Sequence, residues 1–208
     1  MVWALQADGK ALVGKVNVDF NDEAFKNICK QSLSVYDGYE TIQGDDIQMQ
    51  IVPYRDKNVY AIEITDNREK PTDITISLKT PISPDIHVET YSAVSTFDEI
   101  DKALRLSIVM QEKDTEFEEN DFYCEVACTI AVDGRNSDIE AVDSSTKKLT
   151  IPAGNGTFRI LVGAESTMKP EENIKEKALS ELKAVMQLDQ SEIVEATEKS
   201  WHDFWGNP

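Results

Sequence analysis

The sequence predicts a mainly β protein, a large antiparallel β-sandwich (a supersandwich) followed by two C-terminal linker helices. Two observations predict this fold. Up to residue 165, apolar and polar residues alternate in short runs rich in β-branched and aromatic side chains, which is typical of strands. From Thr167 onward, apolar residues recur at helical spacing instead. We therefore expect a β-sandwich domain at residues 1–165 and a helical linker at residues 166–208.

About ten strands are expected, and the short turns between them, without any helical pattern, favour a sandwich. The alternating runs lie at 15–20, 47–52, 60–65, 74–78, 86–94, 103–110, 123–132, 148–151 and 156–162. Residues 36–39, 43–46 and 133–134 predict hairpins, because each segment contains a glycine next to an aspartate.

Two helices are expected after the last strand. Pro170 suits a first helical turn, and the acidic residues Glu171 and Glu172 favour the positive end of a helix dipole. The apolar face of this helix comprises Ile174, Ala178, Leu182, Val185 and Met186. The segment 189–192 has the spacing of a capping box and predicts the start of a second helix. The face of the second helix comprises Ile193, Val194, Thr197, Trp201, Phe204 and Trp205.

The last eight residues contain three large aromatic side chains. A terminal helix cannot bury such side chains by itself, so they are expected to pack against the sandwich or against another domain. We therefore predict interdomain packing for Trp201, His202, Phe204 and Trp205.

Charge and composition exclude several classes of function. The 208 residues include 21 Lys and Arg against 39 Asp and Glu, a formal net charge of −18. A surface this negative repels phosphate backbones, so nucleic acid is not expected as a partner. No apolar stretch is long enough for membrane insertion. Three cysteines make no disulfide framework, and Cys124 and Cys128 are expected as small buried side chains on one strand face.

Several segments, in this order along the chain, carry a family resemblance: 58–68, 121–127, 132–135, 158–164 and 201–205. Together they resemble the N-terminal β-sandwich domain of bacterial glycoside hydrolases that have an (α/α)6 catalytic barrel. The resemblance is to the family 95 type, which is α-L-fucosidase-like, and to its uncharacterised relatives in polysaccharide-degrading bacteria. It covers most of the chain from about Gln31 onward.

The resemblance implies a module that packs against a catalytic (α/α)6 barrel, in cis or as a separate chain, and helps to shape the substrate site. The barrel is absent from this sequence, so no catalytic residue is carried over and the chain is expected to be inactive by itself. The resemblance also implies a periplasmic or extracellular location. Because residues 1–10 have neither the basic nor the apolar region of a signal peptide, the sequence leaves the location open.

Tyr36 and Tyr39 are candidate ligand-binding residues for an oligosaccharide. They flank the turn residues Asp37 and Gly38, and aromatic rings can stack on the apolar face of a sugar. The alternative is that the two tyrosines form a cross-strand aromatic pair that stabilises the hairpin.

No cofactor and no metal site is predicted. The densest acidic cluster, at residues 112–121, is interpreted as a solvated loop, with calcium binding as the alternative hypothesis because hard oxygen ligands suit that ion. His87 lies among alternating apolar residues and is expected to face solvent.

Three functions are therefore consistent with the sequence. The first is a non-catalytic sandwich module of a larger carbohydrate-active protein. The second is a free-standing carbohydrate-binding β-sandwich. The third is a small glycosidase that uses two carboxylates of the sandwich, since glycoside hydrolysis requires such a pair.

Overall fold

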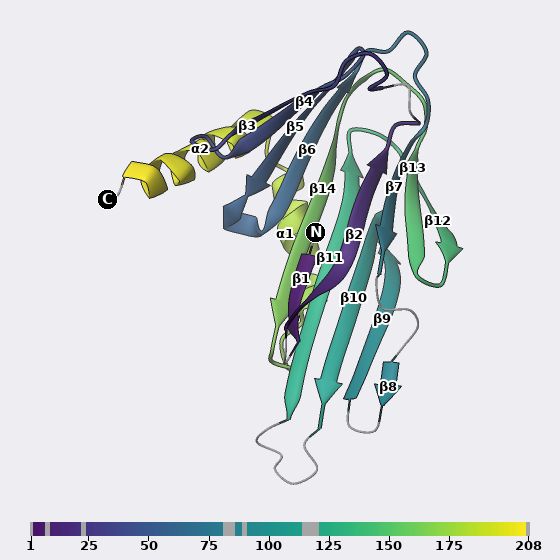
Figure 1. Cartoon of the computed structure of the whole chain (residues 1–208), viewed down its shortest axis with the longest axis vertical. Helices are drawn as coiled ribbons and strands as arrows, with labels where there is room; N and C mark the ends of the chain where they lie inside the picture. The colour runs from purple at the N-terminus through teal and green to yellow at the C-terminus, as the bar shows by residue number, and fades with distance from the viewer. Residues whose placement is uncertain are drawn as a thin grey trace.

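The computed structural model describes residues 2–6, 9–21, 24–80, 86–88, 91–113 and 121–206. Within those residues, two antiparallel sheets of five and nine strands form a sandwich, and two helices follow at the C-terminus (Figure 1). The predicted fold class is confirmed.

The larger sheet has nine strands among the described residues. In spatial order they are β3 (Lys30–Ser34), β4 (Tyr39–Gln43), β5 (Ile47–Tyr54), β6 (Val59–Asp66), β14 (Gly156–Thr167), β11 (Phe122–Asp133), β10 (Ala103–Glu112), β9 (Tyr91–Ile100) and β8 (Ile86–Val88). The smaller sheet has the order β1 (Val2–Gln6), β2 (Gly9–Asp19), β7 (Ile74–Lys79), β13 (Thr146–Ile151) and β12 (Asp138–Asp143). A short 3-10 helix, η1 (Arg55–Lys57), connects β5 to β6.

The hairpins predicted at 36–39 and 43–46 are confirmed, because they connect β3 to β4 and β4 to β5. The hairpin predicted at Asp133-Gly134 is wrong, since β11 and β12 belong to different sheets. Gly134, with φ +85°, lies where the chain leaves one sheet for the other. Turn chemistry signals a change of direction, but it does not reveal which strand the chain joins next.

The single strand predicted at 86–94 is also wrong, because this run is divided between β8 and β9. These two strands pair antiparallel, with Ile86 opposite Ala93. Alternation that continues across a chain reversal cannot reveal the reversal. Strand β3 was not predicted because its residues are mostly exposed and lack an apolar face.

The main hydrophobic core fills the space between the sheets. Its largest fully buried side chains include Leu104, Leu106 and Ile108 of β10 and Phe158 of β14. Cys124 and Cys128 belong to this core, which confirms their predicted burial. Burial raises the pKa of the Cys128 thiol to about 12, so this side chain stays neutral in the folded protein.

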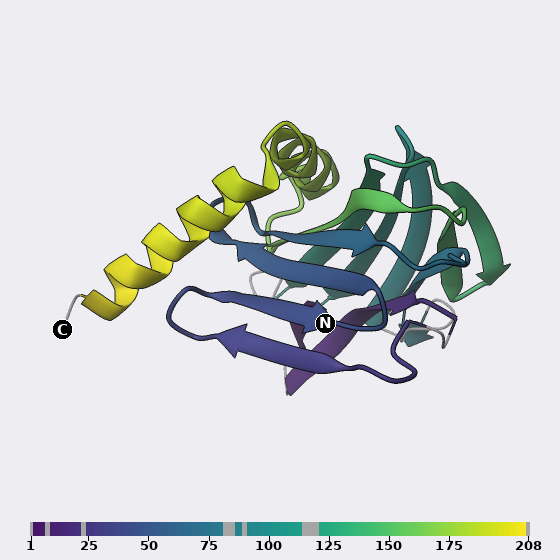
Figure 2. The same ribbon diagram turned by 90° about the horizontal axis from the view of Figure 1, so that it is seen from above.

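A second core lies on the opposite face of the nine-stranded sheet. Helices α1 (Ile174–Met186) and α2 (Gln190–Gly206) lie along that face (Figure 2). Leu179, Leu182 and Val185 of α1 pack there with apolar residues of β5, β6 and β14. Helices therefore cover part of this face and the small sheet covers part of the other.

Helix α1 begins later than predicted. Asn173 is its N-cap, and the Asn173 side chain accepts a hydrogen bond from the backbone N–H of Glu176 at 3.3 Å. Pro170 lies before the helix, where the Thr167 hydroxyl donates to the Glu172 carboxylate at 2.7 Å. Strand β14 extends to Thr167, two residues past the expected boundary at 165.

The capping box predicted at 189–192 is confirmed. The Asp189 backbone N–H donates to Glu192 Oε2 at 2.8 Å, directly before α2. In the described part of the chain, neither helix has the length and apolar character that a membrane crossing requires.

Candidate functional site

The end of α2 rests on the turn between β3 and β4, and this contact brings most of the predicted site residues together. The Tyr36 ring stacks on the His202 ring, with centroids 4.2 Å apart and an interplanar angle of 24°. His202 Nε2 lies 2.9 Å from Asp37 Oδ1. The Trp205 indole N–H donates to the Val35 carbonyl at 3.1 Å. Three contacts between the helix and the turn thus fix the direction of α2.

Gly38 makes room for the helix in this turn. A Cβ atom on Gly38 would lie 1.8 Å from Trp201 Cδ1, and Gly38 has φ +81°. Any other residue would clash with the indole ring and adopt an unfavourable backbone conformation. The Arg55 guanidinium lies over the Trp201 ring, 5.4 Å from its centre. The sequence assigned Gly38 to the hairpin alone, so this second role was missed.

The charge state of Asp37 also favours the contact between the turn and His202. Hydrogen bonding to the Ser34 hydroxyl and then to His202 holds the pKa of Asp37 below its ordinary value. The Asp37 carboxylate is therefore charged at neutral pH and available to the histidine ring.

Tyr39 does not join Tyr36. In the hairpin register Tyr39 lies opposite Ser34, so the cross-strand aromatic pair considered from the sequence does not form. Tyr39 packs at the margin of the second core, whereas Tyr36 is 58% exposed at the tip of the turn. Ligand binding by either tyrosine stays a prediction.

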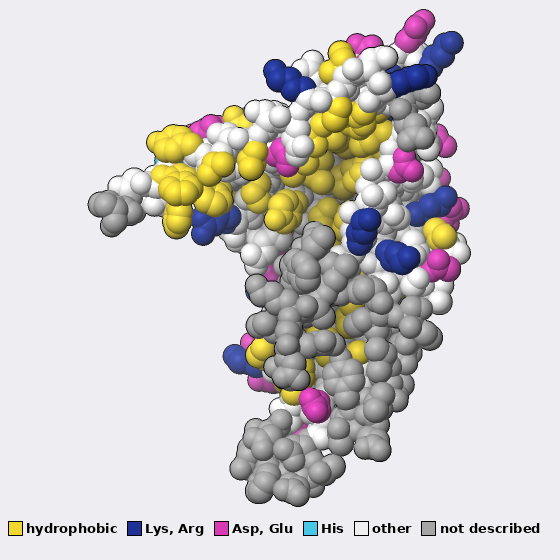
Figure 3. All heavy atoms as spheres, in the orientation of Figure 1, with side chains coloured by type: hydrophobic (Ala, Val, Ile, Leu, Met, Phe, Trp, Pro, Cys, Tyr) yellow, Lys and Arg dark blue, Asp and Glu magenta, His cyan; other side chains and the backbone are white. Residues whose placement is uncertain are grey.

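An aromatic cluster at the end of α2 is half exposed. The Trp201 and Phe204 ring centroids are 5.7 Å apart, and those of Phe204 and Trp205 are 5.0 Å apart. Phe204 and Trp205 are 56% and 48% exposed. Figure 3 shows apolar side chains gathered at the end of α2 and the neighbouring β3. The interdomain role predicted for these residues stays a prediction.

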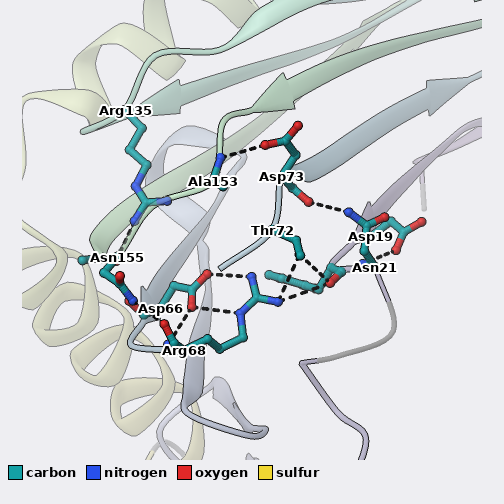
Figure 4. A network of polar contacts seen from close by, with 11 residues as sticks. Asp19, Asn21, Asp66, Arg68, Thr72, Asp73, Arg135, Ala153 and Asn155 are labelled. Carbon is teal, nitrogen blue, oxygen red and sulfur yellow. Dashed lines mark hydrogen bonds and ion pairs between the residues drawn. The ribbon is translucent and has the colours of Figure 1, made fainter. Parts of the chain in front are cut away.

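The segments that carried the family resemblance hold the sandwich together. Arg68 forms a two-pronged ion pair with Asp66, with nitrogen–oxygen distances of 2.9 and 2.7 Å, and both side chains are buried. Arg68 also donates to the Phe20 carbonyl at 3.3 Å, and Asn155 donates to the Arg68 carbonyl at 2.8 Å. Figure 4 shows this network joining segments from both sheets at one end of the sandwich.

Arg159 has a similar structural role on the face of the sheet that the helices cover. Its guanidinium contacts Asp133 of β11 and donates to the Met186 carbonyl at 3.1 Å and to the Leu188 carbonyl. One side chain thus ties the sheet to the end of α1. Because these arginines are buried and paired, the segments that carry the family resemblance have a structural role.

The sequence did not predict a pair of neighbouring carboxyl groups, Glu165 of β14 and Glu181 of α1. Burial raises the pKa of Glu165, but hydrogen bonds from Asn58 and Lys177 outweigh burial and hold this pKa below its ordinary value. Burial and a hydrogen bond to Glu165 raise the pKa of Glu181. Opposite shifts can mark an acid and a base. Here Lys177 and Asn58 already occupy the Glu165 oxygens, so Glu165 serves to hold α1 on the sheet.

Within the described residues, no group of three or more histidine, cysteine, aspartate or glutamate side chains could hold a metal ion. Most of the acidic cluster at 112–121 lies outside the described residues, namely 114–120. The His87 side chain also lies outside them. The calcium hypothesis and the solvent-facing position of His87 stay predictions.

Comparisons with known proteins support the fold. The chain resembles a solved protein from the human microbiome that carries the provisional name of a kojibiose phosphorylase. The TM-score is 0.55 and the identity is 14%, and the match covers 92% of this chain and 27% of the other. The chain thus spans about a quarter of the length of that protein. No family model and no curated protein matches the sequence.

Proposed function

We propose that the chain acts as a non-catalytic N-terminal β-sandwich module of a larger carbohydrate-active protein, and that it packs against a neighbouring catalytic domain. This neighbour is expected to be the (α/α)6 barrel that the resemblance implies. The sandwich would hold that domain in place and help to shape its substrate site.

One observation carries the proposal. Helix α2 is fixed to the β3–β4 turn by Tyr36, Asp37 and Gly38, yet it ends in two rings, Phe204 and Trp205, that are about half exposed. A rigid support with an exposed aromatic end is the arrangement that a docking surface requires, because the rings are held in position before the partner arrives.

The fold match supports the same proposal. The resembled protein is several times longer than the matched part, so there this fold is one part of a larger chain. That protein carries the name of a phosphorylase, whereas the sequence resemblance is to fucosidase-like hydrolases. The docking role depends on neither kind of sugar chemistry, because it requires only a neighbouring domain that covers Phe204 and Trp205.

The test compares the 208-residue chain with a Phe204→Ser/Trp205→Ser variant. The unchanged chain should bind a hydrophobic fluorescent dye and self-associate in sedimentation, because its aromatic end lacks a partner. The double variant should lose most of both signals. Met168→Ser is the matched control, since Met168 is equally exposed, at 59%, but lies before α1.

A clean monomer without a dye signal would contradict the proposal. So would a signal that falls as much in the Met168→Ser control as in the double variant. Either result would favour the alternatives, a free-standing carbohydrate-binding sandwich or a small glycosidase.

A further inference from the structure

The outer face of β4, β5 and β6 forms a polar groove where α2 leaves the sheet uncovered. One part of the groove, of 380 Å³, lies over these strands, and its lining includes Gln43, Gln48 and Thr65. A second part, of 650 Å³, lies between the strands and the N-terminal half of α2. Gln50 and Glu63 line both parts, so the two are continuous.

Strand register arranges the groove side chains in two rows across β4, β5 and β6. The first row comprises Gln43, Gln48 and Thr65, and the second comprises Thr41, Gln50 and Glu63. Outside the groove, each row continues into the neighbouring strands β3 and β14. Neighbouring strands lie about 4.8 Å apart. This spacing is close to the length of one pyranose unit in an extended oligosaccharide.

The chemistry of the rows suits a ligand rich in hydroxyl groups. Each glutamine amide offers two donors and an acceptor, and each threonine or serine hydroxyl can donate and accept. Sugar hydroxyls need both kinds of partner.

The negative charge of the groove limits which hydroxyl-rich ligands it can bind. The groove carries Glu63 on its floor and Asp189, Glu195 and Glu198 on its helical wall. These carboxylates repel phosphates and acidic sugars. The favoured ligand is therefore neutral.

One polar group in the groove is left without a partner. Gln190 is only 8% exposed, and its amide nitrogen donates to Gln50 Oε1 at 3.3 Å. Its own Oε1 is buried without a hydrogen-bond partner among the described residues. Buried polar atoms are rarely left unsatisfied, so this corner of the groove retains an unused acceptor.

We propose that this groove binds a neutral oligosaccharide that lies across β4, β5 and β6, with about one sugar unit over each strand. The site differs from the Tyr36 and Tyr39 positions predicted from the sequence. It is independent of the proposed docking function, because Phe204 and Trp205 lie at the opposite end of α2.

The test is an NMR titration of the isotope-labelled 208-residue chain. The probes are cellohexaose, xylohexaose and maltohexaose, with oligogalacturonate as the anionic comparison. At least one neutral probe should shift the backbone amides of Thr41–Gln50 and Glu63–Thr65, and oligogalacturonate should shift none of them.

The matched variants separate the groove from the tip of the turn. Gln43→Ala/Gln48→Ala should weaken binding at least tenfold, about 1.4 kcal/mol, because both exposed side chains belong to the first row. Tyr36→Ala should leave the affinity unchanged. Thr65→Val, which suits a strand, provides the same test if the double variant loses its fold.

Three results would overturn the inference. The first is the absence of shifts with every neutral probe at millimolar concentration. The second is unchanged affinity in the folded groove variants. The third is loss of binding in Tyr36→Ala, which would place the ligand at the turn. These results concern sugar binding alone, whereas the docking function is tested by dye binding and self-association, so the two proposals can fail separately.

Discussion

The two halves of the nine-stranded sheet differ in how their faces are covered. Strand β11, in one half, is buried at eight consecutive residues, from Cys124 to Ala131. Strand β5, in the other half, keeps Gln48 exposed and Gln50 half-buried on its outer face. The first half has the small sheet on one side and α1 on the other. A strand covered on both faces is mostly apolar, and Glu125 and Thr129 are the two polar residues in the buried run of β11. The uncovered face of the second half, in contrast, can carry hydrogen-bonding groups for a ligand.

The open half has an apolar inner face as well. Phe20, Phe25, Ile42 and Met49 line a recess of 290 Å³ there. The same strands thus present apolar side chains inward and polar ones outward, as their alternating sequences predict. Predictions that damage one half and spare the other test this comparison.

Phe158→Ala should have the largest effect, a loss of about 3–5 kcal/mol of unfolding free energy. Phe158 is 2% exposed, and the Arg135 guanidinium lies 4.5 Å from its ring centre. Urea unfolding measures the change. The neighbouring Thr157→Ala, on the outer face, should cost less than about 0.5 kcal/mol. Equal losses in the two variants would contradict the difference between the faces.

Arg68→Met should cost about 3 kcal/mol, because it leaves the buried Asp66 carboxylate without its cation. Asp66 is 0% exposed and both of its oxygens contact Arg68. Chemical denaturation measures the loss. The double variant Asp66→Asn/Arg68→Met should lose less than the sum of the two single variants, and strict additivity would show that the pair is not coupled.

Gly38→Ala should cost about 2 kcal/mol and release the end of α2 from the turn. The added methyl group would overlap the Trp201 ring, and φ +81° disfavours alanine. Tryptophan fluorescence should shift toward the exposed state in the native protein. In the control Gly154→Ala, the nearest atom would lie 3.9 Å from the new Cβ, and no change is expected.

Glu181→Gln should stabilise the protein at neutral pH by about 1 kcal/mol, or about 2–4 °C in Tm. The raised pKa of Glu181 means that the folded chain binds this proton more tightly than the unfolded chain does. Stability therefore falls as pH rises from the ordinary value of 4.5 through the raised value. Glutamine can donate to Glu165 at every pH, so the gain should vanish near pH 4.5.

The partner substitution Glu165→Gln should act in the opposite direction at neutral pH. The lowered pKa of Glu165 gives stability above its ordinary value of 4.5, and this stability is lost as pH falls through the lowered value. Tm values of both variants between pH 4 and pH 8 provide the measurement. A pH-independent difference for Glu181→Gln would contradict the raised pKa of Glu181.

Gln43→Ala/Gln48→Ala should have the smallest effect on stability, less than about 0.5 kcal/mol, because both side chains are exposed. Thermal unfolding without ligand measures this change. A loss of several kcal/mol would mean that the open half of the sheet is structural and not a surface kept for binding.

The sequence predicted the fold class because alternation and helical spacing reflect which side of each element is buried. It placed the faces of both helices correctly at Ile174, Leu182 and Ile193. It could not predict that Asp133-Gly134 leads to a different sheet, because strand partners depend on packing far away in the chain. Strand β3 was not predicted because neither of its faces is buried, so its sequence shows no apolar alternation.

The candidate site was predictable only in part. Tyr36 and His202 were both selected, but their contact spans 166 positions of the chain and needs the folded hairpin to form. The polar groove was missed because glutamine and threonine are ordinary on an exposed face. Only the register of β4, β5 and β6 shows that these side chains form rows.

The most direct test of the proposed module is the mass of the native product in the source cells, measured by immunoblot with an antibody against the sandwich. A band several times larger than the 23.4 kDa of this chain is expected. A band at 23.4 kDa would contradict the proposed module, because the docking surface at Phe204 and Trp205 would then have no neighbouring domain in cis.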